Sequence, residues 1–158
     1  MSASSKKTFA ENEAVQSPAI RQQYGALPYR VAESSGLEIL LVTSRETKRW
    51  IVPKGWPIKG LKPSKTAARE AYEEAGVRGV VGSKSIGAYV YDKRLNEKAI
   101  VVPCEVRVFP LWVRRQEKIW PEMHQREIRW FAPDDAIASV GENELKAIIA
   151  QFVSRWNS

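Results

Sequence analysis

One short helix most constrains how this chain can fold, because it lies between segments that have the character of strands. Its apolar side chains recur every three or four residues, which places them on a single face that must pack against a core. Those side chains are Ala67, Ala68, Ala71, Tyr72 and Ala75. Ser64 is a residue type that caps helix N-termini, and Gly76 is the type that ends helices. The pattern therefore predicts a helix from Ser64 to about Ala75 with one buried face.

Apolar, β-branched segments lie on both sides of this helix and are typical of strands. The expected strands are Leu27–Glu33, Leu37–Ser44, Trp50–Val52, Val77–Val81, Lys84–Lys93, Ile100–Val113 and Glu127–Phe131. A short helix is expected to begin at Pro133. A final helix is expected near Glu142, where the apolar stripe from Leu145 to Trp156 suits core packing. This order predicts an α/β (α+β) fold in which a mixed central sheet has helices on both faces.

The chain has 158 residues, which suits one domain. Residues 1–22 are polar and lack periodicity, so we expect a disordered tail before a folded domain at 23–158. Lys54–Lys62 holds two glycines and a proline and is expected to be a loop. There is no apolar run long enough for a membrane span and no apolar centre of a signal peptide. The single cysteine, Cys104, excludes an internal disulfide, and we expect it to be buried in a strand of a cytoplasmic protein.

The formal net charge is +7, which favours anionic partners such as nucleotides and polyphosphates. This charge is unevenly distributed along the chain. Between Thr43 and Lys65 there are seven cations and one anion, Glu46, and three acidic residues follow soon after. Cations beside clustered carboxylates are what a phosphate substrate bridged to a metal ion would need.

Glu70, Glu73 and Glu74 form this acidic cluster. Their i, i+3, i+4 spacing places all three on one helical face, opposite the alanines. Like charges so arranged repel each other. A divalent cation would reverse that balance, because Mg²⁺ prefers carboxylate, water and phosphate oxygens as ligands. A solvated acidic face is the simpler explanation for three glutamates taken alone, so the surrounding residues decide between the two.

The residues around the cluster fit a longer motif, G-x5-E-x7-R-E-U-x-E-E-x-G-U, where U is a bulky apolar residue. It matches at Gly55, Arg69, Glu70, Glu73, Glu74, Gly76 and Val77. This motif is the Nudix box, and over roughly residues 24–153 the chain resembles the Nudix hydrolase superfamily. Leu61 replaces the first Glu of the box, which in the family supports the box, commonly through the Arg. Arg69 is therefore expected to find another partner or to pair with the acidic cluster.

The resemblance implies an α/β/α sandwich and a metal-dependent hydrolase that cleaves a phosphoanhydride bond. Glu70 and Glu74 would bind Mg²⁺ or Mn²⁺, Glu73 would bind it directly or through water, and Arg69 would belong to the catalytic set. The Lys54 carbonyl would add a metal ligand. One of these carboxylates, or a glutamate outside the box, would accept the proton from the attacking water. The candidates outside the box are Glu105, Glu122 and Glu127.

A closer resemblance is to the diphosphoinositol polyphosphate and diadenosine polyphosphate phosphohydrolase branch. It rests on LLVTSRETKRWIVPKGW (Leu40–Trp56), on the box, and on IRWFAPDDAI (Ile128–Ile137). It implies that the substrate is a small anionic polyphosphate. The residues expected to bind this substrate are Arg30, Arg45, Arg49, Lys54, Gly55, Trp56 and Arg126. Trp50 and Trp130 are expected in the core and His124 on the surface.

Two other functions stay open. One has the 5′ end of RNA as substrate, which the positive charge permits; the chain lacks an aromatic RNA-binding stretch, so a nucleic-acid partner is not favoured. The other is a ligand-binding or regulatory module with weakened catalysis. Leu61 suggests this module, and the three intact glutamates oppose it. No membrane partner is expected.

Overall fold

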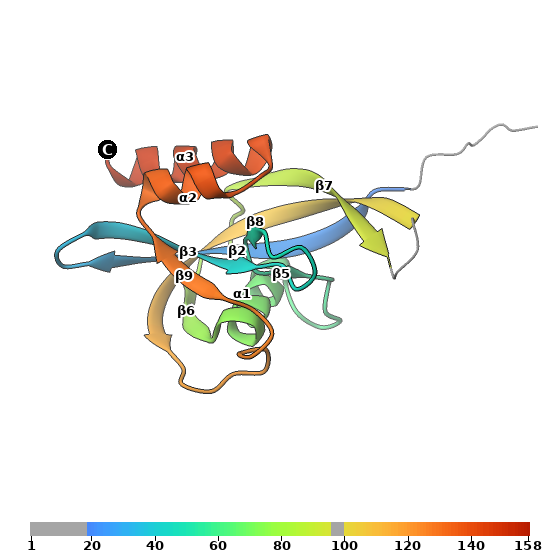
Figure 1. Cartoon of the computed structure of the whole chain (residues 1–158), viewed down its shortest axis with the longest axis horizontal. Coiled ribbons are helices and arrows are strands. Elements are labelled where there is room, and N and C mark those ends of the chain that lie inside the picture. The colour runs from blue at the N-terminus through green and yellow to red at the C-terminus, as the bar shows by residue number, and fades with distance from the viewer. Residues whose placement is uncertain (1–18, 96–99) are drawn as a thin grey trace, which may run out of the picture.

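The computed structural model describes residues 19–95 and 100–158 (Figure 1). Most of the expected tail therefore lies outside the described residues. Arg21 and Gln22, which the sequence assigned to the tail, instead begin strand β2 (Arg21–Ala32) and pair with a neighbouring strand. The first strand thus starts earlier than expected, because backbone pairing stabilises a segment whose side chains are polar.

The described residues form one eight-stranded sheet and three helices. The other strands are β3 (Gly36–Thr43), β4 (Trp50–Ile51), β5 (Lys54–Gly55), β6 (Val77–Val81), β7 (Gly87–Leu95), β8 (Ile100–Gln116) and β9 (Ile128–Phe131). The helices are α1 (Pro63–Ala75), α2 (Pro133–Ser139) and α3 (Asn143–Trp156). The main path of the sheet is β4-β3-β2-β8-β6, with β5 beside β2, β7 beside β8 and β9 beside β3. Strands β2 and β8 are parallel and the other pairs antiparallel, which confirms the predicted mixed sheet.

Helices cover both faces of the sheet, which confirms the predicted α/β/α sandwich (Figure 1). Helix α1 packs on one face, and α2 and α3 pack on the other. Strand β3 contributes side chains to the core on both faces of the sheet. Leu37, Ile39 and Leu41 pack in the core under α2 and α3. Leu40 and Val42 enter the core under α1. A strand buried on both faces needs such a continuous apolar run, because successive side chains point to opposite sides.

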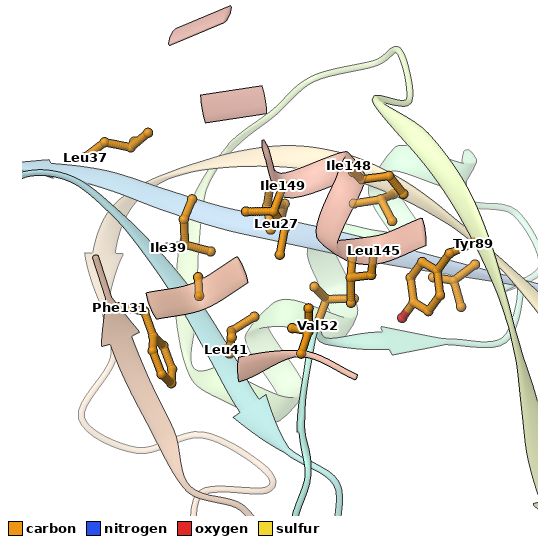
Figure 2. Close-up of a cluster of buried hydrophobic side chains, with 14 residues drawn as sticks. Leu27, Leu37, Ile39, Leu41, Val52, Tyr89, Phe131, Leu145, Ile148 and Ile149 are labelled. Atoms are coloured by element: carbon orange, nitrogen blue, oxygen red, sulfur yellow. The ribbon is translucent and has the colours of Figure 1, made fainter. Parts of the chain in front are cut away.

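Figure 2 shows the core beneath α2 and α3. Leu145, Ile148 and Ile149 of α3 pack in one cluster with Leu27 of β2 and Tyr89 of β7, so the expected stripe on the last helix is core packing. Each such buried side chain stabilises the fold by about 1.5–3 kcal/mol. Helix α3 therefore helps to fix β7 in place. Within residues 19–95 and 100–158, no helix combines the length and apolar content needed to span a bilayer.

Four single-residue expectations are also confirmed. Trp50 packs against the core under α2 and α3, and Trp130 packs against the core under α1. Cys104 is fully buried, and His124 is exposed. The two tryptophans and the cysteine thus serve packing rather than chemistry.

Helix α1 begins one residue before the predicted start. Pro63 occupies its first turn and Lys62 is the N-cap, with φ −66° and ψ 155°. The prediction that Ser64 caps the helix is wrong, because Ser64 is buried within the first turn and none of the described side chains caps this end. Proline explains the shift: its fixed φ suits the first helical position, and it forces the residue before it into an extended conformation.

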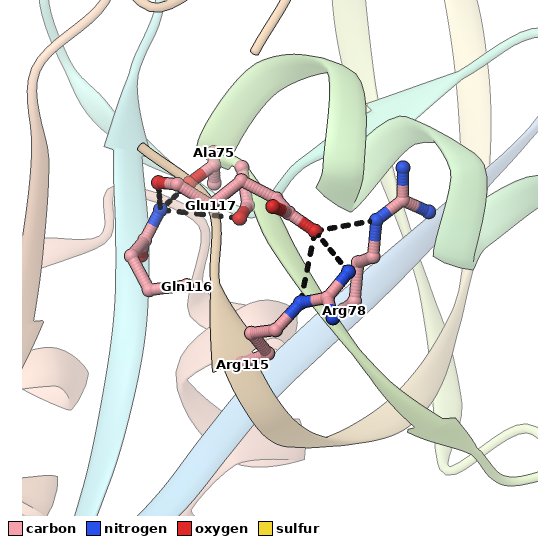
Figure 3. Close-up of polar contacts among 6 residues, drawn as sticks. Ala75, Arg78, Arg115, Gln116 and Glu117 are labelled. Atoms are coloured by element: carbon pink, nitrogen blue, oxygen red, sulfur yellow. Dashed lines mark hydrogen bonds and ion pairs between the residues drawn. The ribbon is translucent and has the colours of Figure 1, made fainter. Parts of the chain in front are cut away.

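The C-terminus of α1 is closed as predicted. Gly76 has φ +71°, in the left-handed region that favours glycine, and its N–H donates to the Tyr72 carbonyl. The Gln116 amide donates to the carbonyls of Ala75 and Gly76 at 3.0 and 3.1 Å (Figure 3). The Glu117 N–H also donates to the Gly76 carbonyl, at 2.7 Å. The end of β8 therefore holds the last turn of α1, which carries part of the acidic cluster.

Candidate active site

One cleft collects most of the predicted site residues. It has a volume of about 660 Å³ and lies between α1, β5, β7 and the segments that follow β3 and β8. Among the described residues, six acidic and six cationic side chains line it: Glu46, Glu70, Glu74, Asp92, Glu122 and Glu142, and Arg45, Arg49, Lys54, Lys93, Arg94 and Arg126. The cleft is thus highly charged but balanced in sign, which suits an anionic ligand that binds together with a metal cation.

Strand β5 makes room for the first acidic residue. The sequence predicted a loop throughout Lys54–Lys62, but Lys54 and Gly55 pair with β2 and are fixed in the sheet. Gly55 lies so close to Glu70 that a Cβ atom at position 55 would stand 2.4 Å from the carboxyl carbon. The glycine therefore leaves space for this carboxylate at the wall of the cleft.

The other two glutamates of the cluster are not equivalent. Glu74 is buried, with a relative exposure of 4%, and it lines the cleft together with Glu70. Glu73 is half-buried and lies outside the lining, although its backbone carbonyl accepts a hydrogen bond from the Glu122 N–H at 3.0 Å. The structure therefore brings Glu70 and Glu74 into the cleft and leaves Glu73 at its border.

Burial raises the pKa of both cleft glutamates. The pKa of Glu70 rises to about 7, because burial disfavours the carboxylate and the charges of Glu73 and Glu122 add to this effect. The pKa of Glu74 rises to about 8, again chiefly through burial, although the nearby Arg126 opposes the rise. Without a cation this pair of carboxyl groups is costly to ionise, and a divalent metal ion would relieve that cost.

Arg126 borders the cleft but is engaged by protein groups. Its Nε lies 2.9 Å from Glu122 Oε1, and its Nη2 lies 3.6 Å from Glu74 Oε2. Its Nη1 donates to the Thr43 carbonyl at 3.1 Å, and the side chain is only 9% exposed. The guanidinium is thus held by three protein groups, and a contact between Arg126 and substrate phosphate stays a prediction.

The three candidate glutamates outside the box are separated by the structure. Glu122 lines the cleft, and its charge contributes to the raised pKa of Glu70. Glu105 lies on β8 and Glu127 is exposed, and both stand outside the lining. Glu122 belongs to the irregular segment between β8 and β9, so no periodicity in the sequence indicated that it would lie beside α1.

Arg69 stands apart from the cleft. It is exposed and forms no ion pair with any of the described residues. Neither expected outcome, another ionic partner or a pairing with the acidic cluster, is seen among the described residues: Arg69 faces solvent, whereas Glu70 and Glu74 line the cleft. Its place in the catalytic set stays a prediction. Leu61, which replaces the first Glu of the box, is half-buried.

Two of the predicted arginines are placed where a phosphate could reach them. Arg45 lines the cleft and donates to Gln125 Oε1 at 3.0 Å. Arg49 also lines it, with Nη1 3.7 Å from Glu142 Oε2. Both side chains belong to exposed residues, and each guanidinium has further donors for phosphate oxygens.

Arg30 is not brought to the cleft. It lies opposite Glu38 in the β2–β3 register, and its Nε is 2.8 Å from Glu38 Oε1. Its guanidinium also lies 4.0 Å from the centroid of the Trp130 ring. The strand register thus explains why Arg30 pairs with Glu38 within the sheet. The predicted contact with substrate finds no support in this geometry.

Lys54 directs its ammonium group toward the ring of Tyr91 in the cleft. Its Nζ lies 4.8 Å from the centroid of the Tyr91 ring, and the Tyr91 hydroxyl donates to Gln23 Oε1 at 2.7 Å. Burial lowers the pKa of Lys54 to about 8, and the charge of Glu74 opposes that change. Lys54 therefore loses its proton more readily than an exposed lysine does.

The sequence reasoning missed the contribution of β7. Tyr89 and the run Tyr91–Arg94 line the cleft. Lys93 Nζ lies 5.9 Å from the centroid of the Trp56 ring. Trp56 borders the cleft and is 39% exposed. The cations at the end of β7 were visible in the sequence, but nothing there indicated that this strand would lie beside Trp56.

The fold and the cleft together define an α/β/α sandwich in which one buried and one half-buried carboxylate lie beside cations, a class suited to phosphate chemistry. Comparison with known proteins agrees with that class. The family model of the NUDIX domain matches residues 24–153. The chain belongs to the Nudix hydrolase family and is an enzyme of that family.

Three similar proteins show the range of this family. Nudix hydrolase 21, chloroplastic, of Arabidopsis thaliana is 32% identical over 139 residues, which cover 85% of this chain and 67% of that protein. Diphosphoinositol polyphosphate phosphohydrolase 3-alpha of Mus musculus is 35% identical over 103 residues, which cover 63% of this chain and 58% of that protein. A crystal structure of a C. elegans Ap4A hydrolase binary complex has a TM-score of 0.64 at 19% identity, covering 87% of this chain and 98% of that chain. At that identity the likeness shows a shared fold.

Nudix hydrolases use divalent metal ions, and the cleft offers suitable donors. Within the described ranges, no three acidic, histidine or cysteine side chains already converge on one point. Glu70 and Glu74 nevertheless line one cleft, and Glu74 Oε1 is buried without a hydrogen-bond partner among the described residues. Two carboxylates completed by water and substrate phosphate are a ligand set that Mg²⁺ prefers. These residues therefore fit a divalent ion, and the Lys54 carbonyl stays a predicted further ligand.

Proposed function

We propose that the chain uses Mg²⁺ or Mn²⁺ to hydrolyse a phosphoanhydride bond of a small, highly charged polyphosphate. The observation that carries this proposal is the placement of Glu70 and Glu74 in one cleft with Arg45, Arg49 and Lys93. The carboxylates suit the ion, and the cations suit the phosphates. Phosphoryl transfer asks a protein mainly for alignment and charge neutralisation, which is what this set of groups can supply.

Each group has a separate task in the proposed reaction. Glu70 and Glu74 would hold the ion, with Glu73 acting through water, and the ion would supply charge neutralisation at the phosphates. Arg45 and Arg49 would bind the phosphate oxygens. A cleft carboxylate would accept the proton of the attacking water as the new phosphorus–oxygen bond forms and the bridging one breaks.

The names of two similar proteins point to two substrate classes, diphosphoinositol polyphosphates and Ap4A. We favour the second class, the diadenosine polyphosphates. Trp56 offers an exposed aromatic face at the border of the cleft, with Lys93 near it, and a planar base can stack on such a face. The balance of cationic and acidic side chains also suits a linear polyphosphate better than a ring that bears phosphates on all sides.

Hydrolysis of a substrate panel tests the proposal. The full chain is incubated with Mg²⁺ or Mn²⁺ and with Ap4A, nucleoside triphosphates, nucleotide sugars or a diphosphoinositol phosphate, and products are separated by chromatography. We expect E70Q and E74Q to lower turnover at least about a hundredfold, since charge stabilisation by a bound ion is worth several kcal/mol. E33Q, in the exposed β2–β3 turn, is the matched control. Full turnover by both E70Q and E74Q would show that the site is assigned wrongly.

Trp56 separates the two substrate classes within the same panel. Base stacking is worth about 1–3 kcal/mol, so W56A is expected to raise the KM for Ap4A about tenfold or more, with partial recovery in W56F. A diphosphoinositol phosphate has no base that could stack on Trp56, so its turnover is expected to change little in W56A. An equal effect of W56A on both substrates would count against a base at Trp56.

The alternatives are other outcomes of this panel. Preferred cleavage of triphosphorylated RNA would indicate the RNA 5′ end as the substrate. Tight ligand binding without turnover with any metal would indicate a binding or regulatory module, which Leu61 suggests. A cytoplasmic location stays a prediction, and the chloroplast in the name of the Arabidopsis relative belongs to that protein.

A further inference from the structure

The arginine of the Nudix box lacks its usual partner in this chain. Leu61 replaces the glutamate, and Arg69 is exposed without an ion pair among the described residues. Helix α1 therefore lacks the salt bridge that commonly supports the box in this family. Another group must hold the acidic face of α1 if Glu70 and Glu74 are to keep their positions.

Arg126 makes the kind of contact that Arg69 lacks. Its guanidinium lies 3.6 Å from Glu74 on α1 and 2.9 Å from Glu122 in the segment after β8, and it donates to the Thr43 carbonyl at the end of β3. One side chain thus joins three parts of the fold. The side chains of Arg126 and Glu74 are 9% and 5% exposed, so solvent and salt screen their attraction much less than at the surface.

The backbone around Arg126 is held independently of this contact. The Thr43 N–H donates to the Glu127 carbonyl at 3.0 Å, and the Glu127 N–H donates to Thr43 Oγ1 at 2.9 Å. Four residues before Arg126, the Glu122 N–H donates to the Glu73 carbonyl at 3.0 Å. Because the segment is anchored at both places, the guanidinium has a defined position without any ligand.

This arrangement leaves one oxygen of Glu74 available. Oε2 faces Arg126, whereas Oε1 is buried and accepts no hydrogen bond from an N–H or hydroxyl group in the described part of the chain, and the neighbouring carboxyl group is that of Glu70. A buried carboxylate oxygen without a partner costs free energy, and a bound cation would remove that cost. The contact with Arg126 therefore determines which oxygen of Glu74 is left for an ion.

We propose that Arg126 is a positioning residue that orients Glu74 for the divalent ion and takes over the supporting role of the Arg–Glu pair of the box. The inference rests on the proposed metal-dependent function. It differs from the substrate-binding role expected from the sequence, because Arg126 acts through Glu74 and leaves the phosphates to other cations. Lysine cannot replace it fully, since a single ammonium does not match the planar fork of donors.

Metal binding tests this role without a substrate. Mn²⁺ affinity is measured by electron paramagnetic resonance for the wild type, R126Q, R126K and R69Q, and for R129Q as the matched control. Arg129 is exposed and lies over the Trp50 ring at 4.9 Å from its centroid. We expect R126Q to weaken Mn²⁺ binding about tenfold to a hundredfold, R126K to recover part of that loss, and R129Q to have no effect.

The two arginines are then compared directly. R69Q is expected to weaken Mn²⁺ binding less than R126Q does, and the opposite order would overturn the proposal. Thermal unfolding in EDTA shows whether each variant is folded. If R126Q does not fold, the Mn²⁺ affinity of R126K tests the proposal, because this variant keeps the buried positive charge and loses only the planar fork of donors. Wild-type Mn²⁺ affinity in a folded R126K would then overturn the proposal.

Turnover separates positioning from substrate binding. If Arg126 positions Glu74, excess Mn²⁺ restores most of the kcat of R126K and the KM for Ap4A stays near the wild-type value. A raised KM with unchanged Mn²⁺ affinity would overturn the proposal in favour of direct phosphate contact. Failure of the wild type to hydrolyse any substrate while it binds Mn²⁺ would count against the proposed reaction alone, since the comparison of metal affinities is independent of turnover.

Discussion

At the scale of single residues, Gly55 decides where the Glu70 carboxylate can lie. A Cβ atom at position 55 would stand 2.4 to 2.7 Å from the carboxyl atoms of Glu70. Those atoms lie at the far end of a flexible side chain, so the Glu70 side chain can move while the backbone around position 55 keeps its place. We expect G55A to lower the free energy of unfolding by about 1 kcal/mol or less, the cost of a shifted rotamer. We expect Mn²⁺ binding, measured by titration calorimetry, to weaken about tenfold or more.

The control for G55A is the same change made in E70Q. If Gly55 acts by leaving room for Glu70, the glycine substitution adds little once the carboxylate is gone, because two changes to one interaction are not additive. A full additional loss in the double variant would show that Gly55 supports the ion by another route, such as the neighbouring Lys54 carbonyl.

Residue types alone predicted part of this site and could not predict the rest. The spacing of Glu70 and Glu74 on one helix is local, so their shared face followed from the sequence. Arg30 and Arg126 are the same residue type, and only long-range pairing separates them from the exposed Arg45. Arg30 meets Glu38 across a strand pair, and Arg126 meets Glu74 of α1 as well as Glu122 of its own segment. The partners of a charge depend on contacts that a single sequence does not display.

At the scale of elements, the last turn of α1 depends on β8. The Gln116 amide donates to two carbonyls at the end of the helix (Figure 3). We expect Q116L to lower the free energy of unfolding by about 1 kcal/mol, the net value of a hydrogen bond, and the melting temperature by about 2–4 °C. Hydrogen exchange at Glu73 and Glu74 is expected to accelerate. Q151L, on the exposed face of α3, is the control, and unchanged exchange in Q116L would show that Gly76 closes the turn without help.

Elements with a long local period were predictable, and those that depend on pairing were not. Helices α1 and α3 carry an apolar stripe over three or more turns, so both were expected. Strand β5 has two residues and exists because it pairs with Tyr24 and Gly25, far away in the sequence. The start of α1 was misplaced because Pro63 is a stronger signal for the first helical position than Ser64 is for a cap.

At the scale of the whole molecule, stability is coupled to pH through the two cleft glutamates. Burial raises the pKa of Glu70 to about 7 and that of Glu74 to about 8, from an ordinary value of 4.5. Between that ordinary value and about pH 8 the folded state holds more protons than the unfolded state, so the free energy of unfolding falls as pH rises. The lowered pKa of Lys54, about 8, acts in the opposite sense but only above that pH.

We therefore expect the melting temperature in EDTA to fall as pH is raised from about 5 to about 7.5, and the E70Q/E74Q variant to lose this slope. Excess Mg²⁺ is expected to oppose the fall, because the ion binds ionised carboxylates and stabilises the folded state more as they lose protons. Differential scanning fluorimetry at each pH, with EDTA or Mg²⁺, measures both slopes, and the variant corrects for all other titrating groups. Equal slopes in EDTA for the wild type and the variant would mean that Glu70 and Glu74 ionise as easily in the fold as in the unfolded chain. Ionising Glu70 and Glu74 in the cleft would then cost no extra free energy, so a divalent ion would have no such cost to relieve there.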